Sequence, residues 1–292
     1  MNTNNPVAVP TAAPRGVVQK TFVPATILSG FTDAAHFGQL AEEYLASISA
    51  EEKAKILADA NATRDFVAHL TPFNPVQVEL REIVHPHVTA IQADPIFAQA
   101  FGRLAHRFRY VDPTGIIALQ ASIEPRSDAV PTTEDALLEF ALPRTWDIPA
   151  EISFIPPQGP IQILTSNPGL QGLAIEMDQP SARVMLSAPK HRNLVQIVQL
   201  NGRYFLRNGY HRIADALTAG MREFPALVVD AFSPNDIALP GAGMFNAGYV
   251  LGLQRPPLVQ DFFTGAALTT KVRERRYGII VSLDVKPINI GI

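Results

Sequence analysis

The spacing of apolar residues changes within residues 194–230. The β-rich run 194–200 is followed by Asn201-Gly202, a dipeptide that accepts the positive φ angles of a type I′ turn, and residues 203–206 can pair back as a second strand. The apolar positions then recur every three or four residues up to Gly220, which predicts a short helix beginning within two residues of Tyr210. Pro225 and the apolar run 226–229 follow. We therefore expect a strand, a hairpin, a second strand, a helix and a third strand.

Residues 26–110 carry mainly helical patterns. Ser49 followed by Glu52 forms a capping box, so a helix is expected to begin there. Asp94-Pro95 is an N-cap residue followed by proline at the first helical position. The apolar stripe that comes after it predicts a helix that continues to about Phe108.

Two further segments flank this helical region. Residues 1–25 are rich in Pro, Ala, Thr and Asn without an apolar period, which predicts a flexible proline-rich tail. In residues 111–292, short apolar runs alternate with turns rich in proline and glycine, a pattern typical of strands and loops. The expected fold class is therefore α+β, with the helical N-terminal part 26–110 packed on a mixed-sheet domain 111–292.

Composition and charge exclude several classes of function. The chain has 292 residues and a formal net charge of −3, so no global positive field attracts it to nucleic acid or to an anionic membrane, and neither is an expected partner. The absence of cysteine removes disulfides, thiolate metal sites and cysteine nucleophiles, and it fits a reducing compartment. No signal-peptide pattern and no apolar run near the ~20 residues of a membrane-spanning helix are present. We expect a cytoplasmic protein.

The segment that precedes the predicted helix at Tyr210 has the chemistry of an anion site. The first N–H groups of a helix lack intrahelical partners, and the helix dipole places partial positive charge there. Gly209 allows close approach of a ligand to the backbone, and His211 and Arg212 add side-chain donors. The candidate phosphate-binding residues are Asn208, Gly209, Tyr210, His211 and Arg212. The competing interpretation is structural, with Asn208-Gly209 as an ordinary turn and Arg212 paired internally, for example with Asp215 or Glu223.

Residues 201–230, N-G-R-Y-F-L-R-N-G-Y-H-R-I-A-D-A-L-T-A-G-M-R-E-F-P-A-L-V-V-D, resemble the core of the ParB/sulfiredoxin superfamily. Gly209, His211 and Arg212 match the G-C-H-R motif with which sulfiredoxins hold ATP phosphates, but Tyr210 stands at the cysteine position. The resemblance therefore implies a nucleotide-binding fold without sulfiredoxin redox chemistry. The ParB motif G-E-R-R-x-R-A is matched only in part, and no helix-turn-helix follows it, so chromosome partitioning is not expected.

Other clusters favour ordinary structural roles. Arg103, His106 and Arg107 would share one helical face, which is more typical of a solvated basic surface than of a phosphate-backbone contact. His85 and His87 could share a metal ion on a strand, but Pro86 lies between them and no third ligand is evident, so no metal site is assigned. P-loop, G-x-G-x-x-G and G-x-S-x-G motifs are absent, and catalytic residues are not assigned.

Two hypotheses of different classes follow. In the first, the domain binds a nucleotide or another phosphorylated ligand, such as a nucleoside triphosphate with Mg²⁺, with NTPase or kinase-like activity as an extension. In the second, it is a non-catalytic structural or protein-interaction protein that retains the fold and has a protein partner. A nucleotide-binding protein should present Gly209, His211 and Arg212 at an open cleft, whereas a structural protein should pair Arg212 internally.

Overall fold

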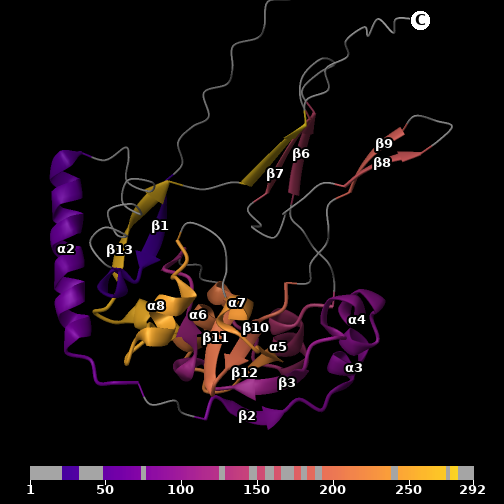
Figure 1. Ribbon diagram of the computed structural model, residues 1–292, viewed down its shortest axis with the longest axis horizontal. Helices are drawn as coiled ribbons and strands as arrows, with labels where there is room; N and C mark the ends of the chain where they lie inside the picture. Colours follow the sequence, from indigo (N-terminus) through magenta and orange to yellow (C-terminus); the bar gives the residue numbers. More distant parts are fainter. Residues whose placement is uncertain are drawn as a thin grey trace, which may run out of the picture.

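The computed structural model describes residues 22–32, 49–73, 77–124, 129–144, 150–154, 161–165, 174–178, 183–187, 193–237, 243–273 and 277–281. Figure 1 shows the arrangement of its helices and strands. Both kinds of element occur, and the sheets include parallel and antiparallel pairs, so the α+β class is confirmed.

The largest sheet is mixed and has six strands. Their order is β2 (Glu79–Glu82), β3 (His106–Val111), β12 (Phe224–Asp230), β10 (Gln196–Leu200), β11 (Arg203–Asn208) and β4 (Ile117–Ala118). β10 lies parallel to β12, and β4 lies parallel to β11, whereas the other neighbours are antiparallel. The central strands are apolar because both of their faces are covered, as the near-complete burial of β12 shows.

The expected unit within residues 194–230 is confirmed. β10 and β11 form a hairpin around Asn201 and Gly202, which both have positive φ angles, 52° and 76°. Helix α6 (Tyr210–Thr218) follows, and it begins at the residue around which it was expected. Gly220, with a φ of 71°, turns the chain towards β12. Ile213 of α6 is fully buried, so the helix contributes its apolar face to the main core.

The N-terminal region contains both helices and strands. α2 (Ala50–Ala68) begins after Ser49, whose side chain accepts a hydrogen bond from the Glu52 amide, as the capping box predicted. α3 (Pro86–Gln92) and α4 (Pro95–Phe101) follow. The expected helix to Phe108 is wrong in its second half, because α4 ends at Phe101 and residues 106–111 form β3. β2 and β3 pair into the six-stranded sheet, so residues 26–110 are not helical throughout, and β3 continues past the expected boundary at 110 to Val111.

A smaller sheet joins distant parts of the chain. Its order is β13 (Leu268–Arg273), β1 (Phe22–Ile27) and β5 (Ser122–Ile123), and all pairs are antiparallel. The short helix η1 (Ser29–Phe31) follows β1 and packs against α2, which runs alongside β1 and β13 in Figure 1. Buried Ser29 and Thr63 share a hydrogen bond of 2.8 Å between their hydroxyl groups and so link η1 to α2.

Gly30→Ala is expected to lower the free energy of unfolding by about 2 kcal/mol, because extra atoms in a packed interface force neighbouring groups apart. An added Cβ would lie 2.5 Å from Val67 Cγ2, 2.6 Å from the Thr63 carbonyl oxygen and 2.9 Å from that of Ala266. Urea unfolding measures the loss. Gly252→Ala is the control, because its Cβ would meet no heavy atom within 4 Å. Equal stability of the two variants would contradict the tight contact between η1 and α2.

The remaining elements complete the described chain. They are η2 (Pro113–Gly115), α5 (Glu134–Ala141), α7 (Pro234–Ile237), α8 (Ala247–Gly252), η3 (Val259–Phe263), and strands β6 (Ala150–Phe154), β7 (Ile161–Thr165), β8 (Ala174–Asp178), β9 (Arg183–Ser187) and β14 (Tyr277–Val281). The apolar runs expected as strands between residues 150 and 190 correspond to β6–β9. Residues 1–21 of the flexible tail expected at 1–25 lie outside the described residues. The tail prediction is wrong for residues 22–25, which belong to β1 and pair with β13.

Candidate functional site

The turn before α6 is held by close backbone packing and by asparagine side chains. Gly209 adopts a φ of 97°, and an added Cβ there would lie 2.6 Å from Cγ2 of Val195. The Asn208 side-chain amide donates to the Asn193 side-chain oxygen and to the Leu194 carbonyl, both at 3.0 Å. Its own oxygen accepts from the Gly209 amide at 2.9 Å. Asn208 and Gly209 thus fix the entry of the chain into α6.

Tyr210 is buried, and its hydroxyl group connects three separate segments. The oxygen accepts from the Leu119 and Gln120 amides at 2.7 and 2.9 Å, and the hydroxyl donates to the Leu206 carbonyl at 2.8 Å. Burial raises the pKa of Tyr210 above the ordinary tyrosine value, although the two amide donors oppose that shift. Tyr210 therefore holds β11 against the segment after β4.

Arg212 caps the C-terminal end of α5. Its Nη1 donates to the carbonyl oxygens of Phe140 and Ala141, each at 3.1 Å, and its Nη2 donates to Asn193 Oδ1 at 2.9 Å. The last carbonyls of a helix have no intrahelical donor and carry partial negative charge, so an arginine there is favourable. Fold stability thus gives a reason for an arginine at position 212.

Other donors meet at the same end of α5. The Val195 amide donates to the Ala141 carbonyl at 2.8 Å, and His87 Nε2 lies 2.7 Å from the Leu142 carbonyl. We call this group of contacts the α5 junction: the carbonyls of Phe140, Ala141 and Leu142 with their donors on Arg212, Val195 and His87. It joins α3, α5, α6 and the start of β10.

The guanidinium of Arg212 is held by neutral acceptors. Burial lowers its pKa to about 10, so the group remains charged at neutral pH. The partial negative charge of the α5 C-terminus supplies part of the compensation. The Asp215 and Glu223 partners considered from the sequence are not the observed ones, since Glu223 instead pairs with Arg81 at 2.9 Å.

The N-terminal end of α6 differs from that of α2, α3 and α4. Side chains of Ser49, His85 and Asp94 cap those three helices, whereas no side chain caps α6 and its first turn has no acidic residue. His211 lies in this first turn and is partly buried. The backbone start of α6 therefore keeps the positive character that the sequence predicted.

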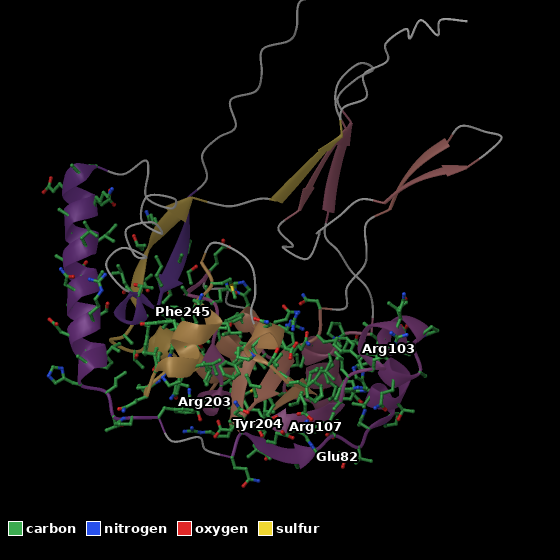
Figure 2. All side chains as sticks on the ribbon, viewed as in Figure 1. Glu82, Arg103, Arg107, Arg203, Tyr204 and Phe245 are labelled. Carbon is green, nitrogen blue, oxygen red and sulfur yellow. The ribbon has the colours of Figure 1, made fainter. Side chains whose placement is uncertain are left out.

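A charged cluster that no local sequence pattern indicates lies on the six-stranded sheet. Arg107 Nε donates to Glu79 Oε2 at 2.7 Å, its Nη2 donates to Glu79 Oε1, and its Nη1 donates to Asp230 at 2.5 Å. Tyr204 donates to Glu79 at 2.9 Å, and Arg109 lies 3.3 Å away from the same carboxylate. Figure 2 shows Tyr204 and Arg107 side by side along the lower side of the sheet. We call these five residues the Glu79 cluster.

The Glu79 cluster also reports on the shape of the sheet. Glu79 on β2 and Tyr204 on β11 are four strand spacings apart, about 19 Å in a flat sheet. Their side chains nevertheless share a hydrogen bond, so the sheet must be strongly curved. Burial alone would raise the pKa of Glu79, but hydrogen bonds from Arg107 and Tyr204 and the charges of both arginines hold it below the ordinary value.

Glu79→Gln is expected to destabilise the protein at neutral pH and to have a smaller effect in acid. A carboxyl group whose pKa is lowered by folding stabilises the folded state above its unfolded pKa, about 4.3 for glutamate. That contribution is lost as pH falls through the lower, folded pKa. Urea melts should therefore show a lower free energy of unfolding for the variant than for the wild type at about pH 7. The difference between the two proteins should shrink as the pH falls below the unfolded pKa of glutamate, about 4.3. A difference that is independent of pH would contradict an ionised Glu79 at the centre of the cluster.

The histidine pair and the basic group predicted from the sequence lie on elements other than those expected. His85 lies at the N-cap of α3 and buried His87 lies within its first turn, rather than on a strand. Arg103 follows α4, whereas His106 and Arg107 lie on β3, so the three do not share a helical face. Within the described ranges, no three histidine or carboxylate side chains are grouped so that they could hold a metal ion. No helix in the described part of the chain is long and apolar enough to cross a bilayer.

Comparison of the chain with protein-family models, with curated proteins and with solved structures finds no match. The geometry of the loop and of its surroundings is therefore the basis for a functional interpretation.

Proposed function

We propose that this chain carries a divergent ParB/sulfiredoxin-like domain in residues 111–292 and works as a non-catalytic protein-interaction protein, in which residues 208–212 make internal structural contacts. The observation that carries the proposal is the position of Arg212. Its guanidinium donates to the last carbonyls of α5 and to Asn193, which is the internal pairing expected of a structural role.

The neighbouring residues support the same interpretation. Asn208 bonds to the segment before β10, Gly209 packs against Val195, and Tyr210 ties β11 to residues 119–120. Each of these contacts joins separate parts of the fold, and none of them involves a ligand. The cysteine-free composition supports a cytoplasmic site of action.

An exposed apolar surface supports the interaction role. A shallow cleft of about 550 Å³ is lined by Val84, His85, Pro86, Thr89, Ala90 and Ala93. Val84 is 89% exposed, so its burial contributes little to the stability of the isolated chain. Val84→Asp should therefore weaken binding of a protein partner at this surface and leave the stability of the isolated chain nearly unchanged.

A second candidate function is the binding of a phosphorylated ligand, such as a nucleoside triphosphate with Mg²⁺, at the N-terminal end of α6. One observation favours it: α6 has neither a side-chain cap nor an acidic residue in its first turn. The ligand would then use backbone N–H groups, with His211 beside them and Arg212 as a fixed positive charge behind them.

A thermal-shift panel separates the two candidates. The wild-type protein is heated with ATP, CTP, GTP and pyrophosphate, each with and without Mg²⁺. A ligand at a hundred times its dissociation constant should stabilise the folded state by ~2.7 kcal/mol. The proposed function predicts no shift with any of them. A shift that is abolished in His211→Ala would instead support the phosphorylated-ligand candidate.

A further inference from the structure

His85 caps α3 with its imidazole ring. The ring Nδ1 accepts a hydrogen bond from the His87 amide at 3.2 Å, the position that an Asn, Asp or Ser side-chain oxygen occupies in a common N-cap. Pro86 takes the first helical position, and the backbone of His85 is extended, with φ −150° and ψ 143°. The start of α3 therefore depends on a titratable acceptor.

The cap contact requires one of the two ring nitrogens to be unprotonated. An Nδ1 that accepts a hydrogen bond carries no proton, so the proton of the neutral ring is on Nε2. Nε2 lies 3.2 Å from Asp135 Oδ1 of α5 and can donate to that carboxylate. Both ring nitrogens are thus used by one neutral tautomer. A second proton on Nδ1 would face the N–H of His87 and remove the cap.

The charged groups around the ring do not compensate for that loss. Asp135 would attract a protonated His85, but its side chain is 88% exposed, and an ion pair with so exposed a carboxylate contributes little. A positive charge at the N-terminal end of α3 is also opposed by the helix dipole.

His87 has different contacts and does not cap α3 with its side chain. Its Nε2 donates to the Leu142 carbonyl, and its Nδ1 lies 3.6 Å from a Glu139 carboxylate oxygen. His85 is therefore the histidine whose ring holds the start of α3.

We propose that His85 makes α3 a pH-responsive element, stable when Nδ1 is an acceptor and loosened when that nitrogen is protonated. α3 lines the shallow apolar cleft around Val84 and Pro86, so this surface changes as the cap is lost. The inference depends only on the contacts of α3 and not on the proposed function.

Amide hydrogen exchange on the full chain tests the proposal, with rates corrected for the intrinsic effect of pH. Protection factors of the Thr89 and Ala93 amides should fall about fivefold between about pH 8 and about pH 5, the equilibrium change that corresponds to loss of a typical N-cap. Amides of β13, which pairs with β1 in the three-stranded sheet, should keep their protection. Constant protection of α3 over this interval would overturn the proposal.

His85→Asn is the matched variant, because asparagine is a favourable N-cap residue that does not titrate in this interval. Its α3 amides should keep the same protection from about pH 8 to about pH 5. If the decrease persists in His85→Asn, His85 is not its source and the proposal fails. As a second measurement, nitrogen chemical shifts of the wild-type ring at about pH 8 should show an unprotonated Nδ1, and a protonated Nδ1 would also overturn it.

Discussion

Arg212→Ala is expected to lower the free energy of unfolding by about 3 kcal/mol, because it removes a charged donor and leaves the buried C-terminal end of α5 without that partner. The three hydrogen bonds to Phe140, Ala141 and Asn193 are lost together. Urea unfolding of the wild type and of the variant at neutral pH measures the difference.

Arg207→Ala is the control for the loss of an arginine. Arg207 lies on β11, close in sequence to Arg212, but it is exposed and its Nη1 donates to the Asp236 carbonyl at 2.9 Å. An exposed bond of this kind contributes much less to stability, so the control should remain near the wild type. If both variants unfold at the same urea concentration as the wild type, Arg212 has no structural role.

Gly209→Val is expected to destabilise the protein by about 4 kcal/mol, the sum of a strained backbone and a steric clash. A β-branched residue is disfavoured at a φ of 97°, and its Cβ would lie 2.6 Å from Val195 Cγ2 and 3.1 Å from Val195 Cα. The expected result is a large decrease in the urea midpoint or a failure to fold.

Gly220→Val separates the two causes. Gly220 also has a positive φ, 71°, but an added Cβ would meet no heavy atom within 4 Å. This variant therefore carries the backbone strain alone and should lose clearly less stability than Gly209→Val. Equal losses at the two positions would show that the approach of Gly209 to Val195 contributes nothing.

Local patterns in the sequence predicted the elements that depend on neighbouring residues. The hairpin at Asn201-Gly202, the start of α6 and the Ser49 cap each follow from residues within a few positions of one another. A helix was expected to reach Phe108 because Phe97, Phe101 and Phe108 fit a helical period. That prediction is wrong beyond α4, because residues 106–111 alternate between partly exposed arginines and buried aromatic residues, as a strand does.

Contacts between distant residues could not be predicted in this way. The carbonyl acceptors of Arg212 lie 71 and 72 residues before it. Every residue has a backbone carbonyl, so residue types do not indicate which carbonyls accept these hydrogen bonds. One hydrogen bond of the Glu79 cluster, from Tyr204 to Glu79, joins residues 125 positions apart across a curved sheet. The sequence shows that Arg107 and Arg109 are basic, but their shared partner Glu79 follows only from the pairing of β2 with β3.

Amide hydrogen exchange of α5 in Arg212→Ala tests most directly whether Arg212 holds the C-terminal end of this helix. Amides near that end, such as that of Leu142, should lose protection by more than tenfold in Arg212→Ala, whereas Arg207→Ala should leave them unchanged. Wild-type protection of α5 in Arg212→Ala would show that Arg212 does not hold this helix.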